Sequence, residues 1–209
     1  MEKIIESFKR AQIEAFCVES KSEATELALE LIEKKRQMCG KSPKEMKISW
    51  GGSVTLDQIG LRDAVSERYD ALNPYVGTPA EQNALKKQAL LSDVFLMGTN
   101  AITENGELVN IDGNGNRLGA LIFGPDMVII VVGKNKLVKN VAEAQKRIKQ
   151  IACVNNAKRL GRATPCAKNG ECGNCYIGGA TICAHTVITR FSGNADRIKL
   201  IIVNEELGY

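Results

Sequence analysis

The stretch Met127-Val-Ile-Ile-Val-Val132 decides the fold class, because every one of its residues is apolar. A strand with one face in water alternates apolar and polar residues, whereas a strand covered on both faces is apolar throughout. Val94–Met97 and Leu118–Phe123 have the same character, and we expect a further strand at Ile198–Val203. Strands of this kind are typical of a parallel sheet that helices cover on both sides.

Amphipathic helices are expected between these strands. The spacing of apolar residues predicts a helix over residues 4–16 and a second helix from a cap at Ser22 to Gly40. Thr78-Pro79-Ala80-Glu81 is a capping box with proline at the first helical position, so a helix should start there and reach about Leu91. Further elements are expected as a strand at 45–50, a helix through 51–64 and a helix that begins at Asn140.

This alternation of helices and buried strands predicts an α/β fold with a doubly wound, mostly parallel sheet. The 209 residues suffice for one domain with an appendage. We expect residues 1–40 to form an N-terminal helical segment packed on an α/β domain of residues 41–209. A cysteine-rich loop at residues 163–185 interrupts the pattern with Gly, Asn and Pro.

Composition excludes several classes of protein. The 44% apolar and 25% charged content is ordinary for a globular protein, and no apolar run approaches the roughly 20 residues that span a bilayer. The N-terminus is unlike a secretory signal, so we expect a cytoplasmic protein that binds no membrane. A net charge of +4 is too small to indicate nucleic acid. A local excess at Lys158, Arg159, Arg162 and Lys168 is either a solvated surface or a site that attracts a small anion.

The cysteines indicate a metal centre. Their number is seven, and four of them follow the spacing Cys166-x5-Cys172-x2-Cys175-x7-Cys183. Cytosolic thiols stay reduced, and closely spaced thiolates select zinc or iron–sulfur clusters. Zinc sites with four cysteines usually pair two C-x2-C knuckles, and only one is present here. We therefore predict a 4Fe–4S cluster, with zinc, or buried or redox-active thiols, as the alternatives.

The fourth ligand decides what such a cluster does. Cys183 has the longest spacing, and without it one iron would be open to a substrate oxygen. His185 lies two residues further on, where it is either an ordinary packed or surface histidine, a cluster ligand or an acid–base catalyst. We expect Cys17, Cys39 and Cys153 to be core or semi-buried thiols.

Four loops carry the candidate substrate-binding residues, because α/β proteins bind ligands where buried strands end. We expect the turn at Asp112–Arg117 to join two strands, Glu107–Ile111 and Leu118–Phe123. The candidates are Gly51, Gly52, Ser53, Thr99, Asn100, Thr103, Asn116, Arg117, Lys134 and Lys136. For each loop, a plain structural turn is as good an interpretation as a binding site. Glu104 and Asp112 join His185 as candidate acid–base catalysts.

At these loops the sequence resembles the lactate-utilisation (LUD) domain family. The motifs are Ser49-Trp50-Gly51-Gly52-Ser53, Ile59-Gly60-Leu61, Asn100-Ala101-Ile102-Thr103, Asp112-Gly113-Asn114-Gly115-Asn116-Arg117, Gly124-Pro125 and Gly133-Lys134-Asn135-Lys136. Thr164-Pro165-Cys166 to Cys183 resembles a cysteine-rich ending of a subset of that family. Residues 1–40 contribute little to the resemblance. It implies a fold similar to the sugar-phosphate isomerase and CoA-transferase superfamily.

Two functions follow from the resemblance and the cysteines together. The first is an accessory component of lactate or related hydroxy-acid utilisation, whose partners would be iron–sulfur oxidoreductase subunits. The second is a stand-alone iron–sulfur isomerase or lyase that acts on a small anionic or sugar-like, hydroxy-carbonyl substrate. A cluster with an open iron favours the enzyme, and a fully ligated cluster favours the accessory component. The oligomeric state stays open, a homo-oligomer included.

Overall fold

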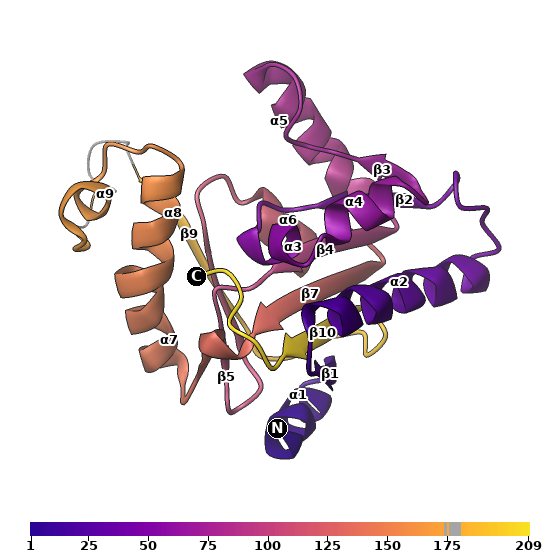
Figure 1. The fold of residues 1–209 in the computed structure, drawn as a ribbon, viewed down its shortest axis with the longest axis horizontal. Coiled ribbons are helices and arrows are strands. Elements are labelled where there is room, and N and C mark those ends of the chain that lie inside the picture. The colour runs from indigo at the N-terminus through magenta and orange to yellow at the C-terminus, as the bar shows by residue number, and fades with distance from the viewer. Residues whose placement is uncertain (174, 176–180) are drawn as a thin grey trace.

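A parallel sheet forms the centre of the fold in the computed structural model, which describes residues 1–173, 175 and 181–209 (Figure 1). Its six described strands lie in the order β1-β10-β7-β4-β2-β3, and every pair is parallel. Their bounds are β1 Glu14–Val18, β2 Lys47–Trp50, β3 Asp70–Leu72, β4 Val94–Gly98, β7 Met127–Gly133 and β10 Ile198–Val203. The carboxyl ends of these strands therefore meet at one edge of the sheet.

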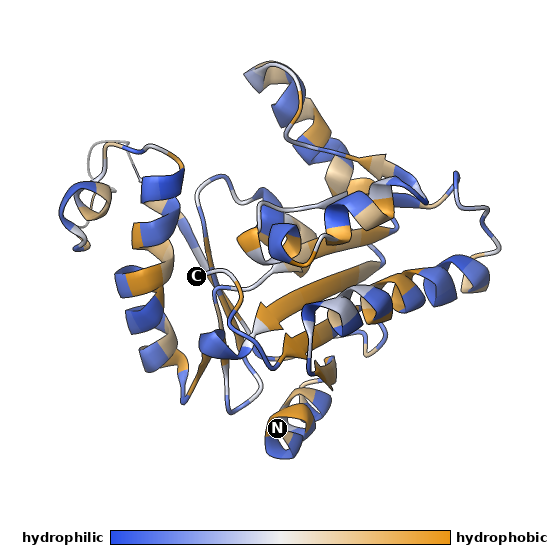
Figure 2. Ribbon diagram, in the orientation of Figure 1, coloured by the Kyte–Doolittle hydropathy of each residue, from blue (hydrophilic) through white to orange (hydrophobic). Residues whose placement is uncertain are grey.

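Both faces of this sheet are buried, as the apolar runs predict. Along β7, Ile129 and Val131 pack toward one helical layer, and Val128, Ile130 and Val132 pack toward the other side. The first layer contains α2 Lys21–Met38, α3 Val54–Gln58 and α4 Leu61–Ser66. The second side contains α1 Glu2–Arg10, α6 Asn116–Ile122 and the short helix η1 Ala89–Leu91. Figure 2 shows the central strands as the most hydrophobic part of the molecule.

A smaller sheet extends the second side. Its order is β8-β5-β6-β9, with bounds β5 Ala101–Thr103, β6 Leu108–Asp112, β8 Leu137–Val138 and β9 His185–Thr189. A long helical segment covers it, consisting of α7 Val141–Arg147, the π-helical turn η3 Ile148–Ala152 and α8 Cys153–Arg159. α9 Pro165–Asn169 packs against α8, and η2 Lys134–Lys136 follows β7. α5 Pro79–Gln88 projects from the body of the molecule (Figure 1), and none of its residues is buried.

Three predicted elements are wrong. Leu118–Phe123 lies in helix α6 and its C-cap and not in a strand, because Leu118, Ala120 and Leu121 pack on the sheet at helical spacing. The first helix ends at Arg10, and Ala15 and Phe16 belong to β1, where they pair with β10. The helix expected through residues 51–64 is split in two by Gly60, whose φ of 68° ends the first part.

Other predictions hold with shifted boundaries. The capping box at Thr78 is present, with Glu81 as its partner, and helix α5 continues through η1 to Leu91. The cap of α2 is Ser20 and not Ser22, because the Ser20 hydroxyl accepts the backbone N–H of Glu23. No helix in the described ranges is long and apolar enough to span a membrane.

Candidate functional site

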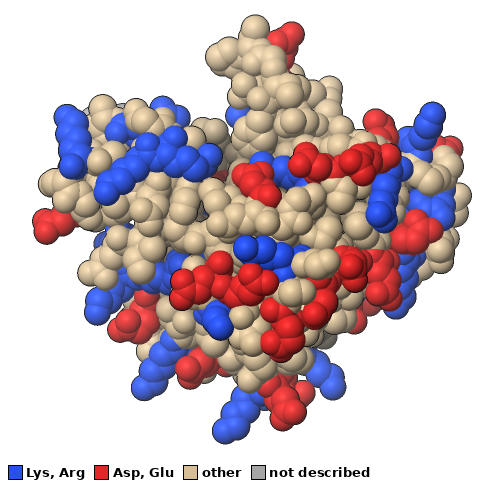
Figure 3. Space-filling view, viewed as in Figure 1, with Lys and Arg blue, Asp and Glu red and all other residues tan. Residues whose placement is uncertain are grey.

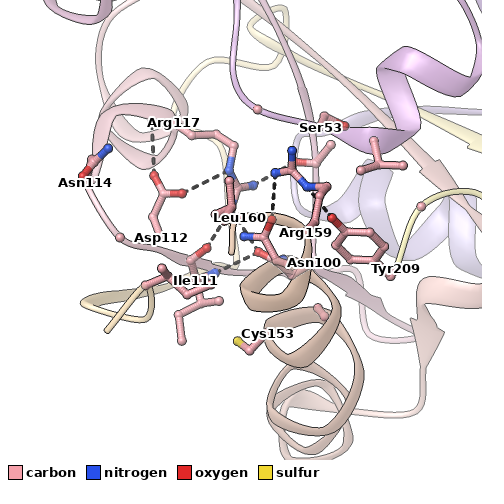
Figure 4. A pocket seen from close by; sticks show the side chains of 18 of the residues that line it. Ser53, Asn100, Ile111, Asp112, Asn114, Arg117, Cys153, Arg159, Leu160 and Tyr209 are labelled. Atoms are coloured by element: carbon pink, nitrogen blue, oxygen red, sulfur yellow. Dashed lines mark hydrogen bonds and ion pairs between the residues drawn. The ribbon is translucent and has the colours of Figure 1, made fainter. Parts of the chain in front are cut away.

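A cavity of about 390 Å³ lies at the carboxyl edge of the large sheet, between the loops that follow its strands and helix α8. Its lining comes from the strand ends and from more distant parts of the chain: α5, α8, the segment before β9 with Thr181 and Ile182, and the C-terminal residues Gly208 and Tyr209. Figure 4 shows Asp112 and Arg117 on one side of it and Arg159 and Tyr209 on the other. A second cavity, of about 520 Å³, adjoins it beyond Tyr75.

Eight of the predicted residues meet at this cavity. They are Gly52, Ser53, Thr99, Asn100, Asp112, Asn116, Arg117 and Lys136. The sequence motifs that carry them lie far apart in the chain, and the parallel sheet brings them together because β2, β4 and β7 all end at this edge.

The other predicted residues lie elsewhere. Thr103 is buried at the far end of β5, where its hydroxyl donates to Glu107, and Glu104 is exposed in the turn that follows. Lys134 is exposed and donates to Asn204. His185 is exposed at the start of β9, opposite Asp112 in the register of β6. Its imidazole lies close to Gly115, since a Cβ there would be 3.3 Å from Cδ2.

Arg117 is the centre of a buried polar network. All five of its N–H donors are engaged: Nε donates to Asp112, Nη1 to Gly98 O and Asn110, and Nη2 to Asn100 and Ile111 O. Asp112 also accepts the backbone N–H of Arg117 and lies 3.3 Å from its Nε. Arg117 therefore positions Asn100 and Asp112 in the wall of the cavity, and its donors are not available to a ligand.

Gly51 has a structural role in the same network. A Cβ at this position would come within 2.9 Å of Cγ and Cδ of Arg117, so the buried arginine stem needs a glycine there. Ser53 likewise caps α3 by accepting the backbone N–H of Leu56. Packing against Arg117 therefore explains the glycine at position 51, and helix capping explains the serine at position 53. Gly52 and Ser53 in addition line the cavity.

Positive charge dominates the cavity. Its described lining contains five basic side chains, namely Lys86, Arg117, Lys136, Arg159 and Arg162, and one carboxylate, Asp112, which is paired with Arg117. Arg159 is held by Tyr209, whose hydroxyl accepts from Nε at 2.6 Å, and by Asn156. Figure 3 shows Lys and Arg side chains gathered over the lobe of α8 and α9, beside a hollow that faces α5.

Lys136 is the most unusual of these groups. Its residue is 4% exposed, and its amine donates to the Thr55 hydroxyl at 3.1 Å. Burial lowers its pKa from the usual 10.5 to about 7, and the positive charges of Arg147 and Arg117 act in the same direction. Among the described residues no carboxylate forms an ion pair with it.

The cysteine loop lies beside this cavity, although residues 174 and 176–180 of it fall outside the described residues. Cys166 is buried against α8, Cys172 is exposed, and Cys175 and Cys183 are half-buried. Cys183 Sγ lies 3.3 Å from Sγ of Cys153, which lines the cavity. The hydrogen bond between these thiols lowers the pKa of Cys183 to about 7 and raises the pKa of Cys153.

The cysteines suit an iron–sulfur cluster by their chemistry. All are thiols, and Cys166 packs in the same apolar cluster as Ile182, the neighbour of Cys183. As placed, the described side chains form no set of three or more His, Cys, Asp or Glu that could hold a metal ion. The donor set thus fits the cluster, whereas the arrangement of the described thiols is not that of an assembled site.

The lining outside the predicted set includes two arginines, two tyrosines and one cysteine. Arg159 and Arg162 belong to the basic excess noted in the sequence, so that excess is a usable signal of the site. Its other two members, Lys158 and Lys168, do not belong to the described lining. Tyr75 and Tyr209 reach the cavity through long-range folding, and no local pattern marks them. Cys153, expected to be a core or semi-buried thiol, is buried but also lines the cavity.

Several solved structures show a similarity to this chain. A DUF162 family protein from Deinococcus radiodurans is 16% identical, with 88% of this chain and 99% of that chain covered and a TM-score of 0.35. A D-ribose-5-phosphate isomerase in complex with phospho-erythronic acid is 19% identical, with 65% and 66% covered and a TM-score of 0.35. The eIF2B beta structure from Chaetomium thermophilum is 13% identical, with 68% of this chain and 47% of that chain covered and a TM-score of 0.34.

The sequence comparisons give the family. No curated protein matches the chain. The family described as LUD domain matches residues 1–203, so the match includes the N-terminal 40 residues, which carry few of the recognisable motifs. Because the match covers nearly the whole chain, this protein belongs to the LUD domain family, which implies a role related to lactate utilisation.

Proposed function

We propose that this LUD-domain protein binds a small hydroxy-carboxylate anion in the cavity, as a component of lactate or related hydroxy-acid utilisation. The observation that carries the proposal is the charge of the cavity: five basic side chains line it, and the one carboxylate of the described lining is already paired with Arg117. An anion would compensate the charges of Lys136, Arg159 and Arg162.

The shape and polarity of the cavity support a small polar ligand. Ligand sites in proteins are typically about 300–1,000 Å³, and this cavity of about 390 Å³ lies at the lower end of that range. Arg159 presents a guanidinium whose Nε and one Nη2 donor are taken by Tyr209 and Asn156, which fixes its orientation and leaves Nη1 for a carboxylate. Asn100 and Asn116 also line the cavity, and their amide groups suit hydroxyl groups of a ligand.

A panel of anions tests this function. D-lactate, L-lactate, glycolate, glycerate and inorganic phosphate are added to the full chain, and the melting temperature is followed. We expect at least one hydroxy-carboxylate to raise the melting temperature in proportion to the logarithm of its concentration. Arg162→Gln should reduce this shift, whereas Lys168→Gln, a neighbouring basic residue outside the described lining, should not. The absence of a shift with every anion would refute the proposal.

We propose in addition that loop 163–185 holds a 4Fe–4S cluster, with Cys166, Cys172, Cys175 and Cys183 as the residues that would bind it. The support is the donor set: four thiols lie within 18 residues, and one of them, Cys183, contacts Cys153 in the lining of the cavity. Such a cluster supplies electron transfer or, with an open iron, a Lewis acid. This chain's own residues bind and orient the anion.

Iron and sulfide analysis tests the cluster. Protein purified without oxygen should contain about four irons and four sulfides per chain. Cys172→Ser and Cys175→Ser should abolish them, whereas Cys39→Ser, which changes an exposed cysteine on α2's C-cap, should leave them unchanged. One stoichiometric zinc in a colourless protein would replace the iron–sulfur proposal with the zinc alternative.

A further inference from the structure

Lys136 is a buried amine in the wall of a cavity, and simple anion binding does not require its burial. Exposed lysines bind anions well, as a hydrated ammonium with three donors. Lys136 instead is 4% exposed, follows β7 in the short helix η2 and points its Nζ at Thr55. The chain packs closely around this amine, since a Cβ on Gly208 would lie 3.0 Å from Nζ.

The groups around Lys136 oppose its charge. Arg117 approaches it from α6 and Arg147 from α7, and both are cations. Thr55 on α3 is a neutral partner, and within the described residues no carboxylate is paired with Nζ. A lysine that is desolvated beside other cations is held partly neutral near pH 7, and its nitrogen lone pair is then available as a nucleophile.

We propose that the Lys136 amine forms a Schiff base with the carbonyl carbon of a small 2-oxo acid bound in this cavity. The inference rests on the proposed function, because a 2-oxo acid differs from a 2-hydroxy acid only by two hydrogens and presents the same carboxylate to Arg159 and Arg162. Nζ forms a bond to the carbonyl carbon, and the carbonyl oxygen leaves as water with both amine protons. The step needs no oxidant or reductant.

The reactivity expected of Lys136 can be compared with that of an exposed lysine. With a pKa of about 7, the Lys136 amine is about half neutral at pH 7. An exposed lysine with a pKa of about 10.4 is neutral in roughly one molecule in 2,500 at that pH. A less basic amine is a weaker nucleophile. We therefore expect Lys136 to be labelled about 100-fold faster than an exposed lysine, which is less than the ratio of their neutral fractions.

Reductive trapping tests the proposal on the full chain. The protein is incubated with pyruvate or glyoxylate and with cyanoborohydride at pH 7, and the reduced adduct is located by mass spectrometry of peptides. We expect one adduct per chain at Lys136. Lys134→Met, which alters the exposed lysine two residues away, should retain the adduct, and Lys136→Met should lose it.

Calorimetric titration of pyruvate, done in parallel, separates this proposal from the proposed function. Pyruvate binding without trapping at Lys136, or with equal trapping at Lys134, would overturn the Schiff base and leave the proposed function in place. If pyruvate and glyoxylate do not bind and no adduct is trapped, the Schiff base is overturned. If the hydroxy-carboxylate panel also gives no shift, the proposed function fails as well.

Discussion

Replacing Lys136 with methionine should change the pH dependence of stability in a way that follows from its buried position. Below pH 7 the folded and the unfolded chain both carry the ammonium, so the full cost of burying it is present. Between pH 7 and 10.5 the unfolded chain binds a proton that folded Lys136 has released. Stability of the wild type therefore rises with pH over this window, by about 1.4 kcal/mol for each pH unit.

The magnitude follows from the lowered pKa. A fall from 10.5 to about 7 corresponds to about 5 kcal/mol of unfavourable burial at low pH. Lys136→Met removes this cost and loses the hydrogen bond to Thr55, a contribution of about 1 kcal/mol. The variant should thus be more stable than the wild type by about 4 kcal/mol at pH 6, and its advantage should vanish near pH 10.

Urea denaturation at pH 6, 7, 8 and 9 measures this difference. Lys134→Met is the matched control, because Lys134 is exposed, and its effect should stay within about 0.5 kcal/mol at every pH. A difference between Lys136→Met and the wild type that does not change with pH would refute the buried, partly neutral amine.

Three further perturbations test the network around the cavity and the projecting helix. Gly51→Ala should destabilise the fold by about 1–3 kcal/mol, since its Cβ would displace the Arg117 stem. Gly193→Ala is the control and should not destabilise it, because a Cβ at position 193 has no atom within 4 Å. Equal urea midpoints of the two variants would contradict this. Arg117→Met leaves Asp112 without its cation and should cost about 3–5 kcal/mol, and an unchanged urea midpoint would argue against the network. Thr78→Ala removes the cap of α5, a helix with no buried residue. Hydrogen exchange in α5 should therefore accelerate about fivefold without a change in the urea midpoint of the whole protein. A shifted midpoint would show that α5 supports the core.

The sequence predicts the large sheet well and one of its helices poorly. β4 and β7 are recognised because strands covered on both faces are apolar throughout, and β10 is apolar at every position except Lys199. Leu118–Phe123 has the same composition over the same short length, and periodicity alone cannot separate a strand from a helix in such a run. The fold resolves it by packing Leu118 and Leu121 on the sheet while Ile122 and Phe123 stay exposed.

The candidate site is predicted in part for a similar reason. Parallel strands bring their carboxyl ends together, so loop residues such as Asn100 and Lys136 can be assigned to one edge before the structure is known. The sequence does not show that Arg117 uses all its donors internally, because that depends on Asn110 and on backbone carbonyls. It also does not show that Cys153 lies beside Cys183, because these residues are 30 positions apart.

The most direct test of the account is the affinity of the cavity for a hydroxy-carboxylate. Calorimetric titration of lactate or glycolate is done with the wild type, with Arg159→Gln and with Lys158→Gln, which alters the exposed neighbour outside the described lining. We expect one bound anion per chain, about tenfold weaker binding in Arg159→Gln, which corresponds to about 1.4 kcal/mol, and unchanged binding in Lys158→Gln. Equal affinity in all three proteins, or no binding to the wild type, would contradict an anion site in this cavity.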